Sequence, residues 1–116
     1  MQHRVGRLEQ EIQREVNDLL LKQVRDPRVQ GITITGVEVT GDLQQATIYF
    51  SILADQASAA TRALAGLNHA KGLIRRELGH RLSIYKTPEI FFKQDQSIRY
   101  GEHIDQLLKQ LHEREQ

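Results

Sequence analysis

The chain has 116 residues, 39% of them hydrophobic and 27% charged, with a formal net charge of +1. This balance predicts one globular domain over residues 1–116 and excludes a disordered chain, and no apolar run approaches the roughly 18 residues of a membrane span. The absence of cysteine excludes disulfides, thiol catalysis and thiolate metal sites.

The first expected element is an amphipathic helix over residues 4–24. Its apolar residues recur in steps of three and four: Val5, Leu8, Ile12, Val16, Leu19, Leu20 and Val24. The helix should end by Arg25, because Asp26 precedes Pro27 and the residue before a proline is pushed out of the helical region. The opening residues MQHRVGRLEQEIQREV lack the apolar core of a secretory signal, so we expect a cytoplasmic protein with no membrane partner.

Two strands are expected next, as an antiparallel hairpin. In GITITGVEVT the isoleucines occupy even positions and the valines odd ones. A β-bulge at Thr35 or Gly36 would add one residue and return both pairs to one face. A turn at Gly41-Asp42 then leads into QATIYFSIL, which alternates between apolar and polar residues as a strand does.

Two helices should connect the second strand to the third. The first has a candidate N-cap at Asp55 and should end near Asn68. The second continues through LIRRELGHRL, and we expect the chain to kink between the two at Ala70-Lys71-Gly72. A helix that starts there would offer an anion free N–H groups and the positive end of its dipole.

A short strand and a last helix complete the expected order. The strand is EIFFKQ, directly after Pro88, and the apolar spacing over residues 97–113 predicts the helix. The order α-β-β-α-α-β-α belongs to the α+β class, with a three-stranded sheet packed against helices. A helix, tight turn and helix between two strands is also the plan of KH modules, although their usual GxxG loop is absent.

Positive charge is concentrated in residues 61–88, which carry 6 Lys/Arg against 1 Asp/Glu, whereas residues 31–60 carry 0 against 3. On a helical wheel, one face of this region collects glycines and basic side chains: Gly72, Arg75, Arg76, Gly79 and His80. Each glycine costs a helix about 1 kcal/mol relative to alanine, which suggests that a ligand approaches the backbone closely. The alternative is a basic helix face that is merely solvated, and the charge run alone favours neither.

The candidate RNA-binding residues are Arg25, Arg28, Ala70, Lys71, Gly72, Arg75, Arg76, Gly79, His80, Arg81 and Lys86. Five cations in the segment from Lys71 to Lys86 would hold phosphates, since arginine can bind them through two parallel hydrogen bonds. Arg25 and Arg28 would be outer contacts, with Arg28 free to reach a phosphate.

Other kinds of site lack their sequence signatures. The five histidines form no HExxH pair, and the chain contains no P-loop, GxGxxG or GxSxG motif. We therefore expect no metal, no cofactor and no catalytic residues. The aromatic residues Tyr49, Phe50, Phe91 and Phe92 lie on expected strands, but TIYFSI does not match the base-stacking motif of an RRM sheet.

The chain resembles the bacterial ribosome-binding factor A family over essentially its whole length. The resemblance is carried by DPRVQGITITGVEVTGDLQQATIYFSIL, AKGLIRRELGHRL, TPEIFF and DQSIRYGEHIDQLL, in this order and spacing. It implies a type II KH-like domain in which Ala70-Lys71-Gly72 replaces the GxxG loop. It further implies a non-enzymatic factor that binds the immature 30S subunit and its 16S rRNA, assists late assembly and 5′-end processing, and supports growth in the cold.

The resemblance also implies release with the help of an assembly GTPase, and we expect a monomer. Other functions stay open on the residues themselves. One is a general RNA-binding or protein-interaction module that docks an acidic partner on its helices. Another is a hydrolase whose site is assembled from distant residues, although no nucleophile or metal cluster supports it.

Overall fold

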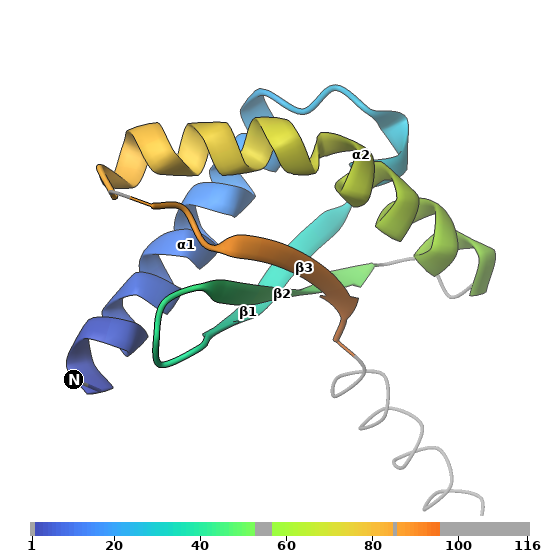
Figure 1. Cartoon of the computed structure of the whole chain (residues 1–116). Coiled ribbons are helices and arrows are strands. Elements are labelled where there is room, and N and C mark those ends of the chain that lie inside the picture. The colour runs from blue at the N-terminus through green and yellow to red at the C-terminus, as the bar shows by residue number, and fades with distance from the viewer. Residues whose placement is uncertain (1, 53–56, 85, 96–116) are drawn as a thin grey trace, which may run out of the picture.

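A computed structural model of the chain describes residues 2–52, 57–84 and 86–95. Its elements are α1 (Gln2–Lys22), the 3-10 turn η1 (Pro27–Val29), β1 (Ile32–Val39), β2 (Gln45–Ile52), α2 (Ala57–Leu82) and β3 (Glu89–Gln94). The expected N-cap at Asp55 and the expected last helix over residues 97–113 lie outside the described residues. Figure 1 shows the helices α1 and α2 together with the three strands, which confirms the predicted α+β class.

The three strands form one sheet in the order β1-β2-β3. β1 and β2 are antiparallel, as the predicted hairpin requires, and β3 runs parallel to β2. The register of β1 shifts between Ile34 and Gly36, so the predicted bulge is confirmed at Thr35. Because of this extra residue, Ile34, Val37 and Val39 are all buried on the face that the helices cover.

Polar side chains of α1 cover the open edge of β1. The amide of Asn17 binds both backbone groups of Ile34: Oδ1 accepts from its N–H at 2.9 Å, and Nδ2 donates to its carbonyl at 3.3 Å. Further along, a carboxylate oxygen of Glu9 accepts from the N–H of Val39 at 2.8 Å. An uncovered edge would be a template for pairing with another chain, and these contacts block that pairing.

The passage between β2 and β3 is one continuous helix, whereas two helices were expected. Its inner face packs on the sheet and on α1 through small and aliphatic side chains: Ala63, Leu67, Ala70, Ile74 and Leu78. Since the helix runs unbroken through Ala70-Lys71-Gly72, the prediction of a helix N-terminus with free N–H groups at Lys71 is wrong. Burial on both sides of this point outweighs the low helix propensity of Gly72.

Figure 1 shows the two halves of α2 running in different directions over the sheet. The helix therefore bends, and a kink at Ala70-Lys71-Gly72 in particular stays a prediction. In the described part of the chain, no helix has the length and apolar character that crossing a membrane requires.

Candidate nucleic-acid interface

The candidate residues divide by exposure. Exposed are Arg25, Gly72, Arg75, Arg76, His80 and Lys86; partly buried are Arg28, Lys71, Gly79 and Arg81; Ala70 is buried. We call the exposed residues Gly72, Arg75, Arg76 and His80 the outer face of α2. The structure thus brings four of the predicted site residues onto one helical surface.

Arg75 and Arg76 differ in how they are held. The guanidinium of Arg75 donates from Nε to the carbonyl of Pro88 at 3.3 Å and from Nη2 to that of Thr87 at 3.2 Å. These bonds orient the side chain beside the start of β3 and leave some of its five N–H donors for a ligand. Arg76 has no hydrogen bond or ion pair within the described ranges, so its charge is available to an external anion.

Lys71 lies on the flank of α2 that faces β3. Its Nζ is 5.6 Å from the centroid of the Phe91 ring, a cation–π distance. Phe91 remains 41% exposed. The ammonium group is therefore oriented by the ring and has no carboxylate partner within the described ranges.

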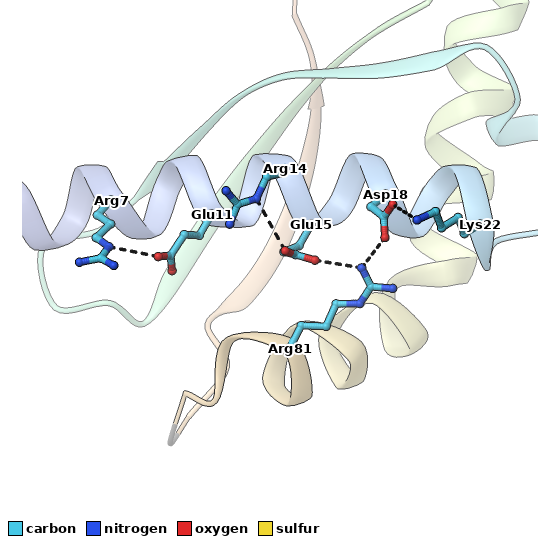
Figure 2. Close-up of polar contacts among 7 residues, drawn as sticks. All are labelled: Arg7, Glu11, Arg14, Glu15, Asp18, Lys22 and Arg81. Atoms are coloured by element: carbon cyan, nitrogen blue, oxygen red, sulfur yellow. Dashed lines mark hydrogen bonds and ion pairs between the residues drawn. The ribbon is translucent and has the colours of Figure 1, made fainter.

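Arg81 lies at the seam between α2 and α1. Its Nη1 is 2.9 Å from a carboxylate oxygen of Glu15 and 2.6 Å from one of Asp18. Figure 2 shows the guanidinium pointing toward α1, where Lys22 also approaches Asp18 at 2.9 Å. The hydrogen bond from Arg81, and to a smaller extent the one from Lys22, hold the pKa of the Asp18 carboxyl below its usual value. Two carboxylates of the protein itself therefore compensate this cation, and its role as a phosphate ligand stays a prediction.

Arg28 is held in the same way. Its Nε and Nη2 lie 3.0 and 2.6 Å from the two carboxylate oxygens of Asp26, and its backbone N–H donates to Asp26 at 2.9 Å. These hydrogen bonds lower the pKa of Asp26 to about 2. The expectation that Arg28 is free to reach a phosphate does not fit this geometry, because its guanidinium group already binds the carboxylate of Asp26.

Arg25 borders an open groove of about 570 Å³ between the end of α1 and the middle of α2. Across the groove lie His69, Ala70 and Leu73. Arg25 is exposed and has no ion pair in the described part of the chain. This groove therefore brings Arg25 close to the predicted Ala70-Lys71-Gly72 site from a distant part of the sequence.

The glycines of α2 have different surroundings. A Cβ on Gly72 would meet no atom within 4 Å, whereas one on Gly79 would lie 2.8 Å from the Thr87 hydroxyl oxygen. A Cβ on Gly66 would lie 2.9 Å from both the Cβ of Arg28 and a methyl carbon of Val29. Gly66 and Gly79 are thus both closely packed, and Gly66 was not among the residues that the sequence singled out. The signal was its spacing, four residues before the buried Ala70, which places both on one side of the helix.

In the residues that the structure describes, no group of three His, Asp or Glu side chains could hold a metal ion.

Comparison with known proteins gives one consistent family. The family model described as ribosome-binding factor A matches residues 4–108. The ribosome-binding factor A of Levilactobacillus brevis is 73% identical over 111 residues, which are 96% of each chain. The alignment thus covers nearly all of both chains.

A crystal structure and a fitted model share the fold. The crystal structure of ribosome-binding factor A from Thermus thermophilus aligns with a TM-score of 0.66 at 20% identity, covering 78% of this chain and 94% of that one. A homology model of the same factor, fitted into a cryo-electron microscopy map of a 30S complex, aligns with a TM-score of 0.56 at 18% identity, covering 74% and 93%. At these identities the likeness shows the fold alone.

Proposed function

The chain belongs to the ribosome-binding factor A family, and from that membership we propose that it binds the small ribosomal subunit during assembly. The observation that carries the proposal is the identity with a curated member over nearly the whole of both chains. The Thermus factor, whose fold is similar, has been fitted into a map of a complex with the 30S subunit. We take the same subunit as the partner of this chain.

The proposed contact surface is the outer face of α2, extended by Lys71 and Lys86. Arg76 and Lys86 are exposed and unpaired within the described ranges, and Arg75 keeps spare donors. Such cations bind the RNA backbone, and their affinity does not depend on base sequence. Arg81 and Arg28 are left out of this surface, because carboxylates of the protein already compensate them.

The finer parts of the proposal concern the stage and the outcome of binding. The protein would bind 16S rRNA in the immature particle, assist late assembly and 5′-end processing, and support growth in the cold. It would act in the cytoplasm as a monomer without cofactor or catalysis, and an assembly GTPase would help its release. Binding can favour one arrangement of the rRNA only by the difference in affinity for the two arrangements.

The test is co-sedimentation of the purified protein with immature small subunits, mature small subunits and large subunits over a salt series. We expect selective binding to small subunits. The affinity should fall steeply with salt. In a plot of the logarithm of the binding constant against the logarithm of the salt concentration, each phosphate contacted should add about 0.7–0.9 to the steepness of the slope. Equal binding to large and small subunits, or none to either, would contradict the proposal.

A nuclease control separates RNA from protein as the partner. The same cations would also attract an acidic protein, and salt weakens both kinds of complex. Digestion of the rRNA should release the factor if phosphates hold it. Retention on digested particles would favour the alternative, a module that docks an acidic protein.

A further inference from the structure

Phe91 is an apolar side chain that the core does not use. In the described part of the chain, two large hydrophobic residues are exposed, Leu21 at 82% and Phe91 at 41%. The neighbours of Phe91 on β3, Ile90 and Phe92, are buried. Because side chains alternate along a strand, Phe91 projects from the opposite face of the sheet, in register with Thr47 of β2.

One cation contacts this ring, and two others lie on the neighbouring parts of α2 and β3. Lys71 approaches it from α2 at 5.6 Å from the centroid. Lys93, two residues along β3, is exposed on the same face, and Arg75 is hydrogen-bonded to the backbone just before the strand. Two exposed carboxylates share this face of the sheet: Glu89 on β3, and Glu38 on β1, which lies across Thr47 from Phe91. Positive charge therefore lies on the side of the ring where α2 meets β3, and Glu38 lies on the side toward β1.

We propose that Phe91 is a stacking platform for an unpaired RNA base on the ring face away from Lys71, with Lys71, which lies over the other face, holding the phosphate next to it. An aromatic ring stacks on any base because every base has a flat π-face, and a neighbouring cation holds the backbone. The base must be unpaired, because a base inside a duplex has no face free for the ring. This inference rests on the proposed function, since it takes RNA as the ligand and names which part of the RNA is bound.

The site would extend the outer face of α2 rather than repeat it. Cations on the helix neutralise phosphates of paired and unpaired RNA alike, so they cannot distinguish the two. A stacking ring adds a contact that only single-stranded RNA can make. Immature rRNA that has not yet formed its final helices would then bind better than the same RNA once it is paired.

The chain offers a direct reporter, because it contains no tryptophan. Phe91→Trp would place a single indole at the site, and a stacked base should quench its fluorescence. We would titrate this variant with a ten-nucleotide single-stranded oligoadenylate and with a duplex RNA of equal length. The expected result is quenching by the single strand and little change with the duplex.

Two further variants separate stacking from general binding. Phe91→Leu keeps an apolar side chain but removes the ring, and should weaken oligoadenylate binding roughly tenfold, within the range for losing one stacked base. Leu21→Ala removes the other exposed apolar side chain and should leave the affinity unchanged. Thermal melts should show all variants folded, and Phe91→Trp retains an aromatic ring in case the leucine variant loses structure.

Subunit co-sedimentation with the same variants separates the two proposals. If wild type binds small subunits but oligoadenylate neither quenches Phe91→Trp nor distinguishes Phe91→Leu, the stacking site is wrong and the proposed function stands. If oligoadenylate quenches while wild type ignores small subunits, the stacking site stands and the proposed function is wrong. Equal quenching by polyglutamate would overturn the stacking site in favour of an acidic protein ligand.

Discussion

The inner and outer faces of α2 each contain a glycine and an arginine, and the two faces use them in opposite ways. On the inner face, Gly66 packs against η1 and Arg81 binds two carboxylates of α1. On the outer face, Gly72 borders open space and Arg76 has no partner within the described residues. Neighbours on other elements, rather than the residue types of α2, decide which residues stabilise the fold and which can bind a ligand.

The charge of this region that a ligand meets is smaller than the sequence alone indicates. Residues 61–88 carry 6 Lys/Arg against 1 Asp/Glu, so positive charge is concentrated in this segment. Figure 2 shows that Glu15 and Asp18 of α1 compensate Arg81. Of the six cations in this segment, those without a carboxylate partner in the described residues are Arg62, Lys71, Arg75, Arg76 and Lys86.

The largest expected effect on stability is at the inner glycine. Gly66→Ala would place a methyl group 2.9 Å from side-chain carbons of Arg28 and Val29, and Val29 is buried. Such overpacking typically lowers the free energy of unfolding by about 1–3 kcal/mol. Urea denaturation would measure this, and an unchanged midpoint would show that η1 moves aside without cost.

The two arginines allow a comparison at equal net charge. Arg81→Glu should lower Tm, because it removes the partner of Glu15 and Asp18 and adds a third carboxylate beside them. Arg76→Glu should leave Tm near the wild-type value and weaken binding to small subunits. Thermal melts and co-sedimentation of both variants check this. A variant Arg81→Glu with native Tm and lost subunit binding would return Arg81 to the contact surface.

The outer glycine should respond in the opposite direction to the inner one. Gly72→Ala meets no atom within 4 Å and lies in a helix interior, so it should raise the free energy of unfolding by up to about 1 kcal/mol. The same methyl group should weaken subunit binding if rRNA packs against the helix backbone there. Unchanged affinity in a stabilised variant would show that Gly72 is not a contact.

The smallest expected effect is a pH dependence of stability that arises from the Asp26–Arg28 pair at η1. The pKa of Asp26 is lowered to about 2 by Arg28, against about 3.9 for an unfolded chain. A lowered pKa stabilises the fold above the unfolded value and loses that contribution as pH falls, here between about 4 and 2. Melts from pH 5 to pH 2 should show that Asp26→Asn has a shallower loss of Tm than wild type. Identical profiles would show that this pair contributes nothing to stability.

Local patterns were enough to predict much of the fold. The change of phase in GITITGVEVT predicted the bulge that lies at Thr35, and the short segment EIFFKQ after Pro88 was predicted as a strand and forms β3, Glu89–Gln94. The bulge follows from the two-residue period of a strand, which the sequence displays directly. The division of this region into two helices was wrong, because small residues weaken a helix without ending it when residues on both sides of them are buried.

Tertiary contacts decide the parts of the site that local patterns missed. The partners of Arg81 lie 66 and 63 residues away, so only the packing of α2 on α1 brings them together. The position of Arg81 on the helix could nevertheless be read from the sequence. Arg81 comes seven residues after Ile74, which is buried on the inner face, so the two lie only about 20° apart around the helix axis. An arginine on the buried face of a helix is first expected to pair with a carboxylate of the protein itself.

The central claim is that cations of the outer face of α2 bind rRNA of the small subunit. The most direct measurement compares the affinity of two double variants for small subunits: Arg75→Glu with Arg76→Glu, and Arg7→Glu with Arg14→Glu on the exposed side of α1. Both change the net charge equally. We expect the first pair to lose at least about tenfold in affinity and to have a shallower salt dependence, while the second pair stays near wild type. Equal losses in both pairs, or a loss in the α1 pair alone, would contradict the claim.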